Sequence, residues 1–369
     1  MAPHFSPATN TQILNAVQTG NHVTINTSQT RGVTIDPTGP RDLPSLRTAL
    51  LNAWDPRTGL FTKAVAAEGS RGPFSRTRDG WERETLTDAH LLWVSDDLAA
   101  VTDDVRSTAP ADATLLREDV PWPSGMVVFQ TPMTGTQAIG DEAGEPMIVN
   151  AVTWGPVMLQ PIHEHGIPAR AGLGISSYSL VDLTQGLGSE ALRASAGFMS
   201  GLLDSEAVFA APGDTVVMTG KVWITLGRSD WCWGDRVDDH LPITTEQQRV
   251  SFEEDRRLLF TLWRLMEQTE IVESHEVTRS KKAARKARPG RRDQPVTVLH
   301  LRRTRSDGGQ PVEGSGRRIT VRHMVRPHWA WQAYGPGRSL RKRILRAGHW
   351  RGPEDGPVKV TERVWSLDR

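Results

Sequence analysis

The stretch RRITVRHMVRPHWAWQAYGPGRSLRKRILRAGHWRGP, residues 317–353, gathers cations, histidines, tryptophans and turn-forming residues into one short segment. Apolar and polar residues alternate over residues 319–325, and this period of two predicts a strand. Pro327 weakens that strand, because proline cannot donate to a sheet ladder. The cluster Tyr334–Gly337 predicts a turn, and the basic arm 338–346 follows it. The segment therefore reads as a basic β-rich unit.

The composition of the chain excludes several classes of protein. A length of 369 residues suffices for one large domain or two ordinary ones. Hydrophobic residues make up 37% and charged residues 24%, which is ordinary for a soluble globular chain. The sequence has no apolar run of transmembrane length and no signal-peptide core at its start. One cysteine, Cys232, excludes an internal disulfide framework and a cysteine zinc cluster. We therefore expect a cytoplasmic protein of a bacterial host, with no membrane partner and no cofactor.

Charge is divided unequally along the chain. Residues 276–369 hold 24 Lys and Arg against 8 Asp and Glu, a net charge of +16. Residues 1–275 hold 20 against 35, a net charge of −15. Such asymmetry indicates nucleic-acid contact at the basic end. The alternative is that the two parts simply attract each other.

The hydrophobic pattern predicts an α+β fold, in which an antiparallel sheet and helices form the body and a small basic β-rich module follows. Amphipathic spacing predicts helices over Leu43–Trp54, Asp88–Asp104 with Thr87 as its N-cap, 189–203, and Glu246 to about Ile271. Short apolar runs predict strands over Gly125–Gln130, 147–159, 173–183, 215–226, 295–303 and 358–367. Within the second helix, we expect His90 and Trp93 to serve packing rather than a site.

These elements divide the chain into four expected parts. They are a polar N-terminal arm (1–43), an acidic α+β body that recognises a polypeptide (44–272), a basic linker (273–294) and a basic Trp/His-rich module (295–369). We expect the linker also to contact RNA, because its like charges repel one another until a polyanion neutralises them. A passive solvated linker is the alternative.

The candidate nucleic-acid-binding residues follow from the chemistry of single-stranded ligands. Basic groups that grip phosphates, beside rings that stack on bases, are the usual equipment for holding such a strand. The candidates are Arg322, Arg326, His328, Trp329, Trp331, Arg338, Arg341, Lys342, Arg343 and Arg346 in the module, and Lys281, Lys282, Arg285 and Lys286 in the linker.

A family resemblance is concentrated in the same segment. The pattern His323-x-x-Arg326-x-His328-Trp329, followed by Gly335-x-Gly337, resembles the C-terminal signature of an anti-CRISPR family that blocks production of the type V-A effector nuclease. This family has many relatives in phages and mobile elements. The resemblance implies recognition of the N-terminal segment of a target polypeptide during its translation, followed by loss of its messenger RNA. Relatives tend to carry Trp-x-Pro after the turn, whereas this chain has Leu-Arg-Ala-Gly at residues 345–348.

Ribonuclease chemistry is a second expectation for the module. Cleavage next to a 2′-hydroxyl needs a general base, a general acid and a cation for the developing phosphorane charge. His328 is the candidate acid or base, with His349 or Tyr334 as its partner and Arg326 or Arg338 as the cation. His328 and Arg326 share strand parity and face one side if the strand persists. The alternative is that these residues only bind RNA or stabilise the module.

Two further motifs have weaker functional interpretations. His163-Glu164-His165 places two imidazoles on one face of a strand, but no third ligand follows nearby, so no metal site is expected. Trp231 and Trp233 are candidates for a peptide groove, because tryptophan is favoured in binding hot spots. A core edge is the alternative for both tryptophans.

The interpretation that these observations favour is an anti-CRISPR-like inhibitor of target protein production, with RNA or the translating ribosome and a target polypeptide as partners. Two alternatives remain. One is a stand-alone ribonuclease of toxin type, and the other is a non-catalytic nucleic-acid-binding protein of a phage or plasmid.

Overall fold

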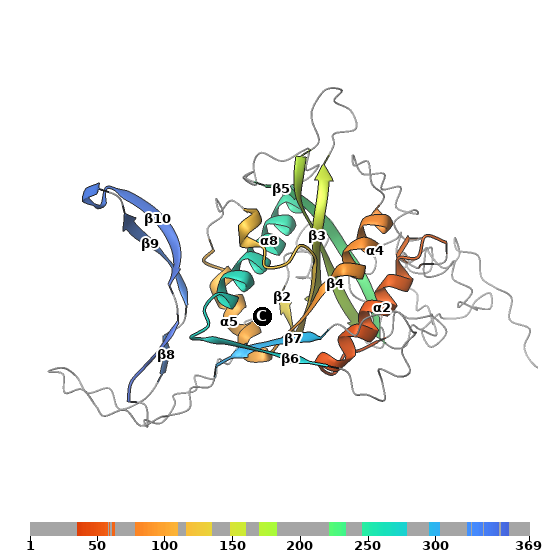
Figure 1. Cartoon of the computed structure of the whole chain (residues 1–369), viewed down its shortest axis with the longest axis horizontal. Helices are drawn as coiled ribbons and strands as arrows, with labels where there is room; N and C mark the ends of the chain where they lie inside the picture. Colours follow the sequence, from red (N-terminus) through yellow and green to blue (C-terminus); the bar gives the residue numbers. More distant parts are fainter. Residues whose placement is uncertain are drawn as a thin grey trace, which may run out of the picture.

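The protein is an α+β structure in which a seven-stranded mixed sheet lies between two layers of helices (Figure 1). The computed structural model describes residues 35–57, 59, 61–62, 78–109, 116–134, 148–159, 170–182, 221–233, 246–278, 295–302, 323–325, 327–334, 336–346 and 348–353. A separate two-stranded ribbon, coloured blue, stands beside one helical layer. The expected fold class is confirmed.

The sheet has the strand order β5-β4-β3-β2-β1-β7-β6. Its strands are β1 (His90–Val94), β2 (Gly125–Thr134), β3 (Ile148–Leu159), β4 (Arg170–Asp182), β5 (Lys221–Cys232), β6 (Val272–Val277) and β7 (Val296–Leu301). β1 runs parallel to both neighbours, β2 and β7, and every other pair is antiparallel. The antiparallel run from β2 to β5 confirms that expectation for the middle of the chain.

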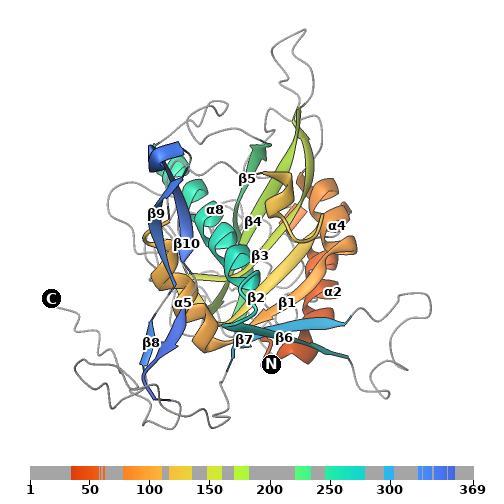
Figure 2. The ribbon, with the colours of Figure 1, turned by 60° about the vertical axis from the view of Figure 1, so that its left-hand side comes forward.

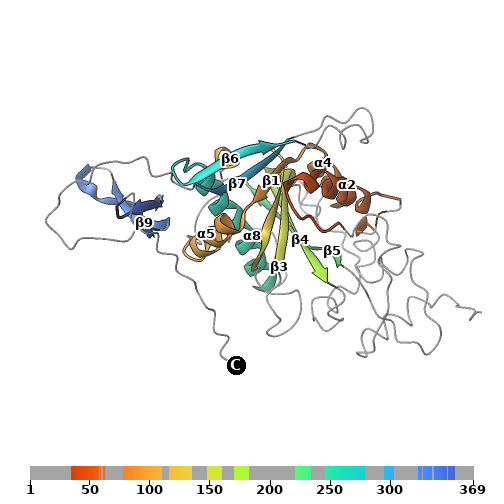
Figure 3. The same ribbon diagram turned by 90° about the horizontal axis from the view of Figure 1, so that it is seen from below.

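Helices cover both faces of the sheet. One face carries α2 (Leu43–Ala53) and α4 (Arg78–Asp88), and the other carries α5 (Asp96–Arg106) and α8 (Glu246–Met266). The view from below shows the same two layers, with the ribbon beyond α5 and α8 (Figure 3). Two short 3-10 helices, η2 (Pro40–Asp42) and η3 (Arg117–Asp119), precede α2 and β2. The expected helices at Leu43–Trp54 and from Glu246 are confirmed, α8 ending at Met266.

The main core lies between the sheet and the α5–α8 layer, with Trp154 of β3 at its centre. Trp154 is fully buried, its ring centroid lies 5.3 Å from that of Trp263 at 67°, and its Nε1 donates to the Trp122 carbonyl at 3.0 Å. Gly125 is paired directly with Trp154, and a Cβ on Gly125 would overlap the indole ring. Glycine is therefore required there by packing rather than by backbone angles.

The helix expected over Asp88–Asp104 is wrong in its first half. Residues His90–Val94 form β1, and α5 begins only at Asp96, after Ser95. Leu91, Leu92, Trp93 and Val94 are all buried, because β1 lies between two parallel neighbours with helices on both faces. A strand covered on both faces shows a continuous apolar run rather than alternation, and such a run also fits a helix.

The sheet also takes in residues that the sequence analysis assigned elsewhere. β6 falls in the expected linker and β7 in the expected C-terminal module, yet β7 lies between β1 and β6. Val296, Val298 and Leu299 are buried in the core of the body. The strand expected over 295–303 is therefore confirmed, but it belongs to the body, and we place the boundary after Arg302. The elements expected at 189–203 and 358–367 lie outside the described residues.

Candidate nucleic-acid interface

Within residues 323–353, called the C-terminal ribbon below, the structure describes 323–325, 327–334, 336–346 and 348–353. The ribbon consists of β8 (His323–Val325), β9 (His328–Tyr334), η6 (Pro336–Arg338), β10 (Leu340–Arg346) and β11 (His349–Arg351). β9 pairs with β10 and β8 with β11, both antiparallel and in the same register. Gly337 and Arg338 adopt positive φ angles of 62° and 56° in the turn. The turn expected at Tyr334–Gly337 and the basic return arm are confirmed.

The ribbon is interrupted where the sequence predicts. Ladder pairing stops on both strands beside Pro327 and Gly348, both of which are buried. A Cβ on Gly348 would lie 2.8 Å from Pro327 Cδ, so the two strands approach closely at this point. Proline supplies no N–H for the ladder, and glycine gives the space that its ring needs.

The ribbon contacts the body through one end of the β9–β10 hairpin. Trp329 and Leu345 are directly paired across the two strands, and both pack against the main core. The Trp329 ring stacks on Phe260 of α8, with a centroid distance of 5.6 Å and an angle of 8°. Figure 2 shows β9 and β10 beside α8. The ribbon therefore packs against the helical layer through the aromatic stack of Trp329 and the aliphatic contact of Leu345.

Ion pairs hold the helix that receives this stack. Arg264 lies over the Phe260 ring at 5.3 Å and pairs with Asp119 of η3 and with Glu267. Nearer the start of α8, Glu254 accepts from Arg257 at 3.2 Å and lies 3.6 Å from Arg106 of α5.

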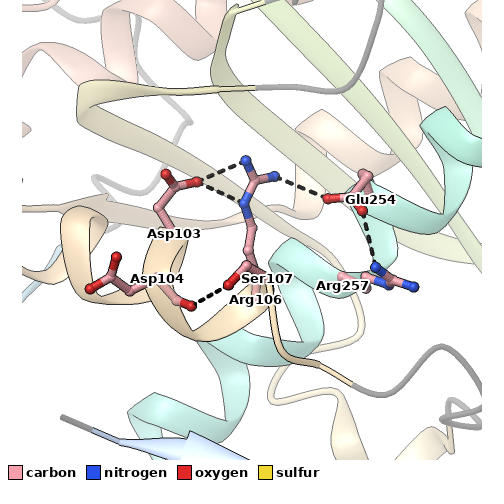
Figure 4. Close-up of polar contacts among 6 residues, drawn as sticks. All are labelled: Asp103, Asp104, Arg106, Ser107, Glu254 and Arg257. Carbon is pink, nitrogen blue, oxygen red and sulfur yellow. Dashed lines mark hydrogen bonds and ion pairs between the residues drawn. The ribbon is translucent and has the colours of Figure 1, made fainter. Parts of the chain in front are cut away.

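Glu254 and Arg106 join α8 to α5 in a second network, in which Arg106 also pairs with Asp103 at 2.7 Å (Figure 4). Arg106 and Glu254 have little exposed surface, so water screens their interaction less than it screens a surface pair. We infer that the network fixes α8 against α5 and so positions Phe260.

The ribbon has an unusually uniform charge. Residues 323–353 include seven Lys and Arg and no Asp or Glu. Exposed cationic or titratable side chains are found on both strands and at the turn, namely His328, Arg338, Arg341, Arg346, His349 and Arg351. Of the other expected nucleic-acid contacts, Lys342 and Arg343 pair with Gln332 and Trp331 in the ladder. Arg322, Arg326, Lys281, Lys282, Arg285 and Lys286 lie outside the described residues.

The candidate catalytic residues are spread along the ribbon rather than gathered. His328 pairs with Arg346, whereas Tyr334 stands six residues further along β9, roughly 20 Å away at the strand rise. His349 pairs with Val325, about three residue positions or roughly 10 Å from the His328–Arg346 pair. Arg326 lies outside the described residues. An acid–base pair must act on the same phosphodiester, and this arrangement brings neither expected partner to His328.

The two candidate peptide-binding tryptophans are occupied in packing. Trp231 is buried, and the guanidinium of Arg256 lies 5.6 Å from its ring centroid. Trp233 is partly buried and packs against the same core. Both fit the core-edge alternative.

The sequence analysis did not single out Glu82, a residue of α4 with a buried carboxyl. Glu82 is fully buried and accepts from Ser176 Oγ at 2.5 Å and from the Tyr178 hydroxyl at 2.7 Å. Trp54 Nε1 donates to the same hydroxyl at 3.2 Å. These bonds tie α4 and α2 to β4. Because Glu82 and Tyr178 are closed to solvent, we assign the cluster to the architecture of the body.

His90 packs as the sequence predicts, although in a strand instead of a helix. Its ring stacks on Trp122 at 3.9 Å and 7°, and its Nε2 lies 2.9 Å from Thr297 Oγ1. Burial lowers the pKa of His90 below its ordinary value, and the nearby Glu276 carboxylate offsets part of that effect.

This pKa gives a testable pH dependence. Below about pH 6.5 the unfolded chain binds a proton at His90 more readily than the folded protein does, so the free energy of unfolding falls as the pH drops. One proton gives a slope of at most about 1.4 kcal/mol per pH unit. We expect His90→Phe, which keeps a ring against Trp122, to be less sensitive to acid than the wild type in urea unfolding at pH 5 and pH 7.5. Equal slopes for the two proteins would contradict the assignment.

The described part of the chain contains neither a group of metal-ligating side chains nor a membrane-spanning helix. Among these residues, no three His, Cys, Asp or Glu side chains form a group that would hold a metal ion. His163 and His165 lie outside them. No helix within the described ranges has the length and apolar character to cross a membrane.

No protein-family model matches the chain, and no curated protein matches it.

Proposed function

We propose that this protein binds single-stranded RNA through the C-terminal ribbon. We further propose that it stops production of one target protein during translation, by recognising the nascent polypeptide and causing loss of its messenger RNA. The RNA-binding part is supported by the ribbon itself, and the translational part by the resemblance of residues 323–337 to the anti-CRISPR signature.

The main support for RNA binding is the concentration of positive charge on the C-terminal ribbon. Seven cations and no carboxylate occupy residues 323–353, whereas residues 1–275 carry a net charge of −15. A polyanion is attracted to the first surface and repelled by the second. The ribbon extends from the body, joined to it at Trp329 and Leu345, so that exposed arginines on β10, at the turn and on β11 are accessible.

A binding role fits the described geometry better than the toxin-type ribonuclease. Among the described residues, the ladder register separates His328 from both of its expected acid–base partners, His349 and Tyr334. In that case this protein would not cut the messenger RNA itself. The loss of messenger RNA would be carried out by cellular machinery that the protein arrests or recruits. Incubation of purified protein with RNA, beside His328→Ala, tests this point. Cleavage that depends on His328 would favour the ribonuclease.

Co-sedimentation with ribosomes from expressing cells tests the translational part. We expect the full chain to travel with polysomes and to leave them after puromycin, which releases nascent chains. A ribbon variant, in which Arg338, Arg341, Arg346 and Arg351 are all changed to Gln, should stay in the supernatant.

The matched control is a body variant with four exposed arginines changed in the same way, namely Arg41, Arg57, Arg117 and Arg302. It removes the same charge from the body and should sediment like the wild type. Binding that ignores puromycin but needs the ribbon would indicate a general nucleic-acid-binding protein. No sedimentation of the wild type would count against the translational proposal.

A further inference from the structure

The two tryptophans of β9 have different environments. Trp329 is partly buried and stacked on Phe260, whereas 54% of Trp331 is exposed. They are two residues apart in one strand, so the pleat directs both rings to the same face of the ribbon. Trp331 therefore lies on the face of the ribbon that is directed toward α8, two residues beyond Trp329, which contacts the body.

We infer that Trp331 is the platform on which one base of the bound RNA stacks, and that Trp329 is a structural anchor. This inference rests on the proposed RNA binding. Base–aromatic stacking accepts any base, because every base has a π-face. A large apolar ring that remains half exposed in a folded ribbon is suited to that contact, and Trp331 is exposed whereas Trp329 is only partly so.

A cation stands in position to hold the adjoining phosphate. Arg341 is exposed and pairs with Ala333, which makes it the diagonal cross-strand neighbour of Trp331. Diagonal neighbours lie about 7–8 Å apart, within reach of long side chains on the same face. Stacking on Trp331 and a phosphate contact from Arg341 would together fix one nucleotide.

The placement of Trp331 favours a single strand over other polyanions. In an RNA duplex the bases are stacked on one another inside the helix, so an indole has no free base to cover. An anionic bilayer presents charged headgroups but no base on which an indole could stack. A single strand can enter beside the ribbon and turn a base toward the ring.

The test compares three ligands with full-length proteins. They are a labelled 12-nucleotide oligouridine, an abasic strand with the same sugar–phosphate backbone, and a 12-base-pair RNA duplex. We expect Trp331→Ala to bind oligouridine roughly 5- to 150-fold more weakly than the wild type, the range for loss of one stacked base. Its affinities for the abasic strand and the duplex should be unchanged, and so should the salt dependence, because no charge is lost.

Two conservative variants complete the test. Trp331→Phe, which keeps a ring, should retain most of the affinity for oligouridine. Trp329→Phe, which keeps the stack on Phe260, should bind like the wild type. If the wild type binds oligouridine and Trp331→Ala binds it equally well, the inference is overturned while RNA binding stands. If the wild type binds none of the three ligands, the proposed function itself fails.

Discussion

Replacement of the four exposed ribbon arginines, Arg338, Arg341, Arg346 and Arg351, with glutamine is expected to weaken binding of a 12-nucleotide RNA by on the order of 100-fold at 150 mM salt. Each arginine that neutralises a phosphate releases about 0.7 of a counterion from a single strand. Four lost contacts should therefore reduce the slope of log affinity against log salt by about 3. Fluorescence anisotropy between 50 and 300 mM KCl measures both quantities.

The slope distinguishes contact with phosphates from damage to the fold. The body variant carries the same change in net charge, so it should keep the wild-type slope and lose no more than a few-fold in affinity through long-range attraction. Circular dichroism of the ribbon variant should match that of the wild type, because all four side chains are exposed. An equal loss of slope in the two variants would mean that RNA is held by the charge of the whole molecule rather than by the ribbon.

The ribbon is where local sequence determined structure most directly. Pro327 and the Tyr334–Gly337 cluster predicted an interrupted strand, a turn and a return arm, and the ladder follows that pattern. Proline geometry and turn chemistry act over a few residues, so they can be read without knowledge of the rest of the fold. The apolar stripe of α8 is similar, because Leu258, Leu259 and Leu262 recur at helical spacing and are buried together.

The errors arose where distant parts of the chain determine the structure. The run Leu91–Val94 fits a helix by its own spacing, and only the parallel pairing of β1 with β2 and β7 makes it a strand. β7 follows the basic residues that suggested a new module, yet its valines complete the sheet of the body. Parallel pairing joins residues about two hundred positions apart, as between Leu92 and Thr297, and no local pattern records it.

The candidate site shows the same division between local and distant information. The sequence placed histidine, tyrosine and arginine within a short segment, and their proximity along the chain suggested a catalytic group. An extended strand separates such residues by about 3.3 Å per position, so Tyr334 lies far from His328. The different environments of Trp329 and Trp331 depend on Phe260 of a remote helix. Residues that bind nucleic acid could therefore be proposed from composition, but their individual roles could not.

The largest expected loss of stability follows the change Trp154→Ala. Trp154 is fully buried, contacts Trp263 edge to face and hydrogen-bonds the Trp122 carbonyl. Removal of a buried tryptophan side chain costs about 3–5 kcal/mol, through lost burial and the cavity that remains. Collapse around the gap is limited here, because the residue directly opposite in the sheet is Gly125, which has no side chain to fill it. We expect a loss in that range when unfolding in guanidinium chloride is followed by circular dichroism.

Two variants separate the contributions to this loss. Trp154→Phe keeps an aromatic ring but leaves the partly buried Trp122 carbonyl without its indole donor, so it should lose about 1–3 kcal/mol. Trp331→Ala removes an equally large but half-exposed ring and should change stability by less than about 0.5 kcal/mol. Because Trp154 supports Trp263 on α8, and the same helix carries Phe260, Trp154→Ala should also loosen the ribbon and weaken RNA binding near its unfolding midpoint. A loss below about 1 kcal/mol for Trp154→Ala would show that the core does not depend on this ring.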